Sequence, residues 1–162
     1  MSPLYYANVT LHVLAAMFWL GGMFFLGLVG APALRRLEPA LRTRLFEEIG
    51  LRFRAAGWIA IAVLLGTGAA NLHYRGLLST EALAEAAFWG SGYGRMLAIK
   101  LGMVLAMLAV SAVHDFGIGP AASRAQPGSA EAERLRRWAV RLGRLNAVLG
   151  LILVLAAVRI AR

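Results

Sequence analysis

Long apolar runs alternate with short arginine-rich segments along this chain. Charged residues are absent from the centres of three of these runs, and the centre of the remaining one contains only Lys100. A helix needs about 20 mostly apolar residues to cross the hydrocarbon core of a bilayer. The pattern therefore predicts an all-α integral membrane protein, with residues 1–162 forming a single four-helix membrane domain. The predicted transmembrane spans are at about 6–30, 54–74, 95–116 and 139–159.

The composition supports a membrane protein and excludes several other classes. Of 162 residues, 60% are hydrophobic and 15% are charged, whereas soluble domains average about 45–50% and about 25%. The chain has no cysteine, which excludes a disulfide scaffold, thiolate metal sites and covalent haem attachment. The net charge of +9 is confined to the segments between apolar runs. We therefore expect the lipid bilayer, and no nucleic acid, as the partner of these charges.

The distribution of basic residues predicts the orientation. Segments 35–54 and 115–144 each carry six arginines, whereas Arg75 and Arg95 are the only basic residues between the second and third spans. The positive-inside rule places the two arginine-rich segments in the cytoplasm, so that both termini are extracytoplasmic. The four tyrosines then lie at the outer ends of spans, as an aromatic belt requires. Short connections favour an up-down bundle.

The segments between the spans suggest further helices. Apolar spacing after Pro39 predicts an amphipathic helix that either lies on the membrane surface or extends the second span. Residues 119–130 read as a flexible stretch, followed by a basic helix that runs into the fourth span. A short outer helix is expected near residues 80–88, with Ser79 as its N-cap. The sequence shows no strong internal repeat, and its glycines suit either close helix packing or the approach of a flat cofactor.

Polar residues in the first span share one helix face. Asn8, His12, Trp19 and Met23 are spaced by four, seven and four residues. A histidine within a membrane is costly and usually marks a site in the protein interior. His12 is therefore a candidate ligand, and a hydrogen bond to a neighbouring helix is the structural alternative.

Lys100 is the only lysine beside sixteen arginines, and it lies about 7 Å inside Arg95 along the third span. It either snorkels to the outer surface, binds an anion or a propionate, or gates a path for cations. Three methionines and His114 share its helix face, at positions 96, 103, 107 and 114. Thioethers and imidazoles suit Cu(I), although methionine stripes also serve core packing. His114 beside Asp115 is expected to form a local pair facing water.

The predicted orientation brings His12, His73 and Lys100 to the same outer side of the membrane. Their depths differ, because His12 lies about 9–12 Å inside its span and His73 only about 2–3 Å from its helix end. Helix tilt or an inward extension of the second span is needed to bring the two histidines together.

Three segments resemble the copper-resistance D (CopD) domain. The run from Leu11 to Gly22 (LHVLAAMFWLGG) resembles its first helix, and Arg52-Phe53 with Gly66-Thr67-Gly68 resembles its second. Gly92-Tyr93-Gly94-Arg95, followed by Leu97 and Lys100-Leu101, resembles its third. The resemblance implies a bacterial inner-membrane protein for copper uptake or tolerance. The spacing of His12, Trp19 and Gly21-Gly22 is also similar to the HemJ family, whose four-helix members bind haem b and oxidise protoporphyrinogen.

These observations leave three hypotheses, of which the first is a copper-handling protein with a redox-active metal centre near the extracytoplasmic side. Its expected metal ligands are His12, His73, Met23, Met96, Met103 and Met107. The second is a haem b protein for electron transfer or porphyrin oxidation, with His12, His73, Lys100 and Trp19 around the cofactor. The third is an assembly protein without a cofactor. A periplasmic copper or electron donor is the expected partner, and homo-oligomerisation is left open.

Overall fold

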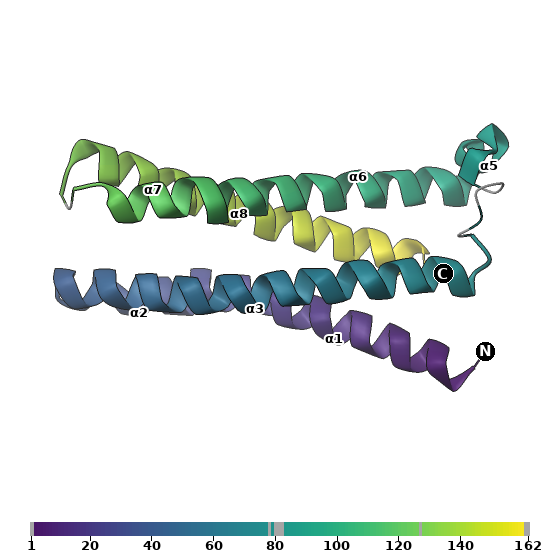
Figure 1. The fold of residues 1–162 in the computed structure, drawn as a ribbon, viewed down its shortest axis with the longest axis horizontal. Helices are drawn as coiled ribbons and strands as arrows, with labels where there is room; N and C mark the ends of the chain where they lie inside the picture. Colours follow the sequence, from purple (N-terminus) through teal and green to yellow (C-terminus); the bar gives the residue numbers. More distant parts are fainter. Residues whose placement is uncertain (1, 78, 80–82, 127, 161–162) are drawn as a thin grey trace. The chain divides into compact units, whose positions relative to one another are not determined.

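The computed structural model describes residues 2–77, 79, 83–126 and 128–160, and these residues contain helices and no strand (Figure 1). Four helical stretches among them are long and apolar enough to cross a membrane: Pro3–Leu34, Ala40–Tyr74, Gly92–Arg124 and Ala130–Ala157. The first three predicted spans lie within one of them each, and the fourth, 139–159, overlaps the last stretch and ends two residues beyond it. The all-α fold with four membrane-spanning helices is therefore confirmed.

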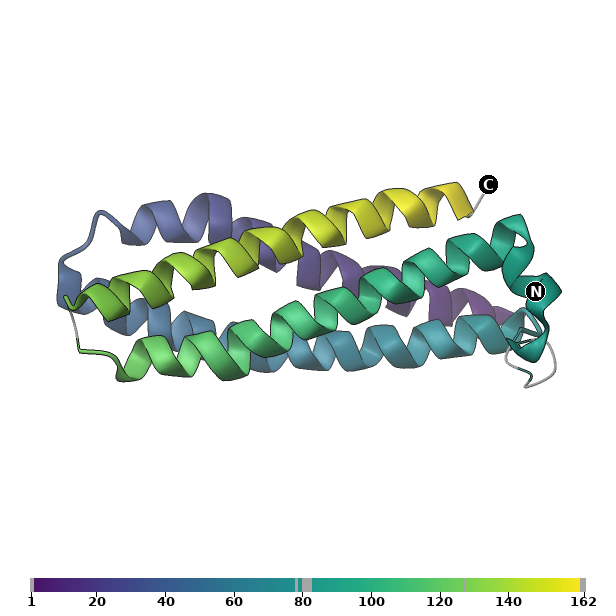
Figure 2. The same cartoon turned by 90° about the horizontal axis from the view of Figure 1, so that it is seen from above.

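The chain forms two compact units, residues 1–94 and 95–162. Unit 1 contains α1 (Pro3–Phe25), η1 (Leu26–Gly30), α2 (Ala31–Leu34), α3 (Pro39–Tyr74) and the short α5 (Ala86–Gly90). Unit 2 contains nearly all of α6 (Gly92–Ala112), then η2 (Val113–Ile118), α7 (Gly119–Arg124) and α8 (Ala130–Ile160). Within unit 1, α1 and α3 run antiparallel, and within unit 2, α6 and α8 do so (Figures 1 and 2).

The two units share one order of elements, although the sequence shows no strong repeat. In each, a long helix passes into a π-helical segment, then into a short helix with proline as its second residue, Pro32 or Pro120. A proline ring would clash with the carbonyl group four residues earlier in a regular α-helix. The wider π turn just before each proline is a common way to accommodate such an interruption. The second long helix then returns antiparallel to the first.

The structure decides between the two alternatives for the segment after Pro39. This segment is the first part of α3, which continues without a break through the second span to Tyr74. The carboxylate of Glu38 caps the helix by accepting hydrogen bonds from the amides of Ala40 and Leu41, both at 3.3 Å. At the other end, Gly76 has a φ of +70°, and the amide of Leu77 donates to the carbonyl of Leu72 at 3.0 Å. This arrangement is a glycine-terminated helix end.

The prediction of a flexible stretch at residues 119–130 is wrong in its first part. Residues 119–124 form α7, because proline is well tolerated in the first turn of a helix. The basic helix expected after this stretch is confirmed as α8, where the Ser129 hydroxyl accepts a hydrogen bond from the Ala132 amide at 3.1 Å. The outer helix expected near residues 80–88 includes residues 80–82, which lie outside the described residues. Ala86–Gly90 form α5.

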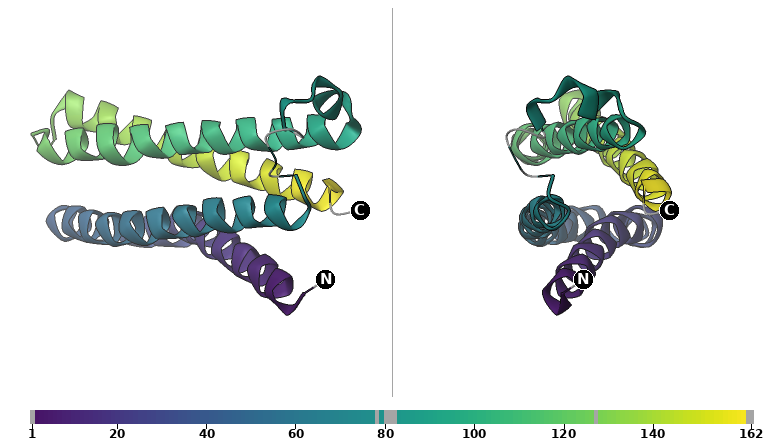
Figure 3. Two further views of the ribbon diagram at one scale, coloured as in Figure 1. Left: turned by 45° about the vertical axis from the view of Figure 1, so that its right-hand side comes forward. Right: turned by 90° about the vertical axis from the view of Figure 1, so that its right-hand side faces the viewer.

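Small residues allow α1 and α3 to pack closely in unit 1. Trp19 is 7% exposed, and its indole lies 3.6 Å from the point that a Cβ atom on Gly57 would occupy. A Cβ atom on Gly22 would overlap the ring of Phe53. Gly22 therefore makes room for the Phe53 ring of the neighbouring helix, whereas a Cβ atom at Gly57 would make ordinary van der Waals contact with Trp19. Figure 3 shows the two helices side by side in both views.

In unit 2, α6 and α8 are joined by a buried polar pair. The amide nitrogen of Asn146 donates a hydrogen bond of 2.7 Å to the hydroxyl of Ser111, and both residues are 6% exposed. Met107, one turn before Ser111, is also buried. Polar side chains that pair across helices in a membrane contribute about 0.6 kcal/mol on average. The pair therefore serves mainly to fix where the two helices meet.

Candidate functional site

The candidate site is a row of polar side chains between α1 and α3, inside unit 1. Asn8 on α1 donates two hydrogen bonds to α3, one to the carbonyl oxygen of Thr67 at 3.1 Å and one to the Oδ1 atom of Asn71 at 3.0 Å. One turn further along α1, His12 Nδ1 lies 2.7 Å from Oγ1 of Thr67. Asn8 and His12 are four residues apart, as are Thr67 and Asn71. Two antiparallel helices thus match their polar residues turn by turn.

The hydrogen bonds of Thr67 favour one tautomer of His12. The Thr67 hydroxyl donates its only hydrogen to the carbonyl of Val63, at 2.6 Å. Its oxygen therefore accepts in the contact with His12, so that Nδ1 of the histidine carries the hydrogen. In the neutral ring, Nε2 then holds the lone pair. Metal-binding histidines commonly have this arrangement, in which one ring nitrogen donates to a fixed partner and the other binds the metal.

The His12 ring lies against α3 beside Gly68. A Cβ atom at Gly68 would be 3.7 Å from Cε1 of the histidine, which is ordinary van der Waals contact. Thr67 is 7% exposed and His12 is partly buried. The imidazole is therefore held by a hydrogen bond on one edge and by packing against the helix backbone on its side.

The polar row has different surroundings at its two ends. Beyond His12, towards the π segment, the α1 face continues with the buried residues Ala15 and Trp19. In the other direction it reaches Tyr5, whose ring makes an edge contact with Tyr74, with the ring centres 5.7 Å apart. The row is therefore closed by apolar packing on one side of His12 and leads to the helix ends on the other.

Arg75 lies at this end of unit 1, just beyond α3. Burial lowers its pKa, but hydrogen bonds to Tyr5 and Tyr93 and the charges of the two phenols raise it, so that the pKa is raised overall. The guanidinium is therefore charged at any physiological pH. It places a permanent positive charge among the tyrosines at the end of the polar row.

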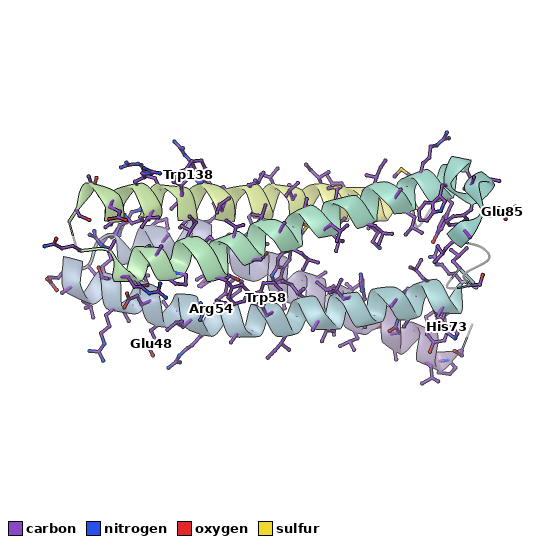
Figure 4. The ribbon with its side chains drawn as sticks, turned by 45° about the horizontal axis from the view of Figure 1, so that its top comes forward. Glu48, Arg54, Trp58, His73, Glu85 and Trp138 are labelled. Atoms are coloured by element: carbon purple, nitrogen blue, oxygen red, sulfur yellow. The ribbon has the colours of Figure 1, made fainter. Side chains whose placement is uncertain are left out.

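The structure does not bring His73 to His12. His73 is six residues beyond Thr67 on α3, which corresponds to a rise of about 9 Å and a rotation of about 240° around the helix. Its side chain is exposed near the end of α3, where its ring centre is 6.2 Å from that of Tyr74 (Figure 4). Met23 is likewise distant, about 16 Å beyond His12 along α1. Trp19 serves in the packing against Gly57.

The other predicted residues belong to unit 2. Met107 is buried, and Met96, Lys100 and Met103 are partly buried on the same face of α6. Lys100 precedes Pro120 by 20 residues, and His12 precedes Pro32 by the same number, so the two occupy equivalent positions in the common order of elements. His114 Nδ1 lies 2.8 Å from Oδ1 of Asp115, which confirms the expected local pair.

Among the described residues, no group of three or more His, Cys, Asp or Glu side chains is placed to hold a metal ion. A copper site at His12 must therefore use other donors, such as thioethers. Sequence reasoning singled out His12 and Asn8 but missed their partners on α3, Thr67 for His12 and Asn71 for Asn8. The signal was present, because both polar pairs have the same four-residue spacing on successive spans.

These features define a multi-pass helical membrane protein with a hydrogen-bonded histidine inside one helical pair. The family model of copper resistance protein D matches residues 47–160, more than two thirds of the chain. The chain therefore belongs to the copper resistance protein D (CopD) family. The match begins within α3, so it includes Thr67 and Lys100 but not His12.

A relative from Aquifex aeolicus (strain VF5), described as an uncharacterized protein, is 36% identical over 151 residues. This similarity covers 93% of the present chain and 90% of the relative. No solved structure matches the chain. The family relation thus rests on sequence, and it links the chain to copper resistance.

Proposed function

We propose that this protein serves copper uptake or tolerance and that His12 binds the copper ion within the membrane. The observation that carries the proposal is the contact of 2.7 Å between His12 Nδ1 and Thr67 Oγ1. With Nδ1 as the donor in this contact, the lone pair of the neutral ring is on Nε2. A neutral imidazole is a ligand that suits copper, and thioethers suit Cu(I) in particular. Membership of the copper resistance protein D family supports copper as the ion.

The residues around His12 fit a copper ion that is transported or bound transiently. They fit less well a copper ion that is held by a complete set of protein ligands. Met23 is too far along α1 to share an ion with His12. Met23 would act as a separate thioether ligand for Cu(I). The methionines of α6 are also predicted thioether ligands. The polar row from Tyr5 to His12 would supply a hydrated approach, in which Asn8 orients the backbone and side chains around the histidine.

The packing does not distinguish the haem b hypothesis from copper binding. Among the glycines of the first two spans, Gly22 faces the Phe53 ring and Gly68 faces His12, whereas a Cβ atom at Gly21, Gly27 or Gly66 would meet nothing within 4 Å. Detergent-purified protein with its visible spectrum and its metal content distinguishes the hypotheses. We expect a colourless sample that binds stoichiometric Cu(I). A Soret band with sharp reduced-state bands would instead identify a haem protein, and a sample with neither would indicate an assembly role.

The proposal includes an orientation of the protein in a bacterial inner membrane. The arginine distribution predicts that both termini lie outside the cytoplasm. The chain contains no cysteine, so single cysteines report position cleanly. In intact cells, Ser79→Cys is expected to react with a membrane-impermeant thiol reagent and Ser129→Cys to react only after permeabilisation. The opposite labelling pattern would reverse the topology and place the candidate site at the cytoplasmic end.

A further inference from the structure

A stripe of arginines with one tryptophan runs along the first half of α8. Its members are three to four residues apart along the helix and therefore share one face. All of them are exposed: Arg134, Arg137, Trp138, Arg141 and Arg144. Figure 4 shows Trp138 on the outer side of α8.

This arginine stripe lies on a different face of α8 from the one by which the helix packs in unit 2. Leu135, Leu142 and Asn146 lie on the packing face, where they are partly or fully buried and where Asn146 bonds Ser111. The helical repeat places the centre of the stripe about 120°, a third of a turn, away from these residues. The arginines are therefore not used to join α8 to α6.

Acidic residues neutralise little of the stripe. Glu133 lies 3.6 Å from Arg137, but both side chains are more than half exposed, so the pair is weak. No acidic residue follows Glu133 along α8. The guanidinium of Arg141 lies 5.4 Å from the centre of the Trp138 ring, and this cation–π contact orients it along the helix surface.

The same helix face continues as an exposed apolar strip. Leu145, Val148, Ile152 and Leu155 follow the arginines at the spacing of three to four residues, and each is between 46% and 60% exposed. From Leu145 to Leu155 the helix rises about 15 Å, which is half of a hydrocarbon core of about 30 Å. The strip thus has the length of one leaflet.

We propose that this face of α8 binds an anionic phospholipid, with the phosphate headgroup on the arginine stripe and the acyl chains along the apolar strip. Guanidinium groups bind phosphate through paired N–H donors, and tryptophan favours the interface between headgroups and hydrocarbon. A nucleic acid or an acidic protein would match the arginines but would leave the apolar strip uncovered. A phospholipid matches both parts, and the chain is a multi-pass membrane protein.

The test measures lipid binding to the full protein in an uncharged detergent by native mass spectrometry. Phosphatidylglycerol and phosphatidylcholine with identical acyl chains are titrated separately. We expect phosphatidylglycerol to bind preferentially, and Arg134→Gln/Arg141→Gln/Arg144→Gln to weaken its binding about tenfold or more. The matched control, Arg42→Gln/Arg44→Gln/Arg52→Gln in α3, removes the same charge and is expected to retain the binding. The single variant Arg141→Gln provides a milder change, with an intermediate loss.

Three results would overturn the proposal. Equal loss in the two triple variants would show an effect of net charge alone. Equal binding of the two lipids would show that the headgroup is not recognised. Displacement of the lipid by inorganic phosphate or by an acidic peptide at comparable concentration would show an anion site that does not require acyl chains.

Discussion

Replacement of His12 by alanine is expected to abolish copper binding by unit 1. The change removes the imidazole whose Nε2 atom holds the lone pair, and no neighbouring side chain on α1 or α3 supplies an equivalent nitrogen within the polar row. The loss of affinity for Cu(I) should exceed the 10–100-fold that is typical of changes to residues that only support a ligand. Competition with a chromophoric Cu(I) chelator measures it on the purified protein.

The fold should survive this change, since a hydrogen bond between membrane helices contributes only about 0.6 kcal/mol on average. Thermal melting followed by circular dichroism checks this point. His114→Ala is the matched control, because His114 pairs locally with Asp115 in unit 2. Retention of full copper binding by His12→Ala, or its loss in His114→Ala, would contradict the proposed site. His73→Ala tests separately whether the second predicted histidine is also a ligand.

Thr67→Val is expected to weaken copper binding about 10–100-fold although Thr67 does not touch the ion. Valine has nearly the same shape but lacks the oxygen that accepts the hydrogen of His12 Nδ1. The ring would lose its fixed orientation and its preference for the tautomer with the lone pair on Nε2. Thr67→Ser keeps the hydroxyl and is expected to restore most of the affinity.

Measuring the tautomer of His12 shows whether Thr67 orients the His12 ring or only contributes to helix packing. In the unaltered protein, ¹⁵N NMR of labelled histidine should show a protonated Nδ1 and an unprotonated Nε2 for His12. Thr67→Val should mix the two tautomers, and Thr67→Ser should not. A valine variant with the original tautomer and undiminished copper affinity would assign Thr67 to helix packing only.

The sequence was sufficient to predict the four membrane-spanning helices, because burial in lipid demands a long apolar run for each one. It also identified His12 as costly in that setting and predicted the local pair of His114 and Asp115, which are adjacent in the chain. The family resemblance rested on short motifs, and the match over residues 47–160 confirms it. These features depend on composition and local spacing, and they are therefore visible without a fold.

The partners of His12 were decided by tertiary structure. Thr67 is 55 residues away in the chain, and only the antiparallel packing of α1 against α3, in which Gly22 leaves room for Phe53, brings its hydroxyl to the imidazole. The same packing directs His12 towards α3, whereas His73 lies about 120°, a third of a turn, away from Thr67 around that helix. The continuation of α7 beyond Pro120 and the meeting of Ser111 with Asn146 were equally invisible in the one-dimensional pattern. Hydrophobicity determines which segments enter the membrane, but the side chains that meet there depend on the rotation and register of each helix, and these are set by packing between residues distant in sequence.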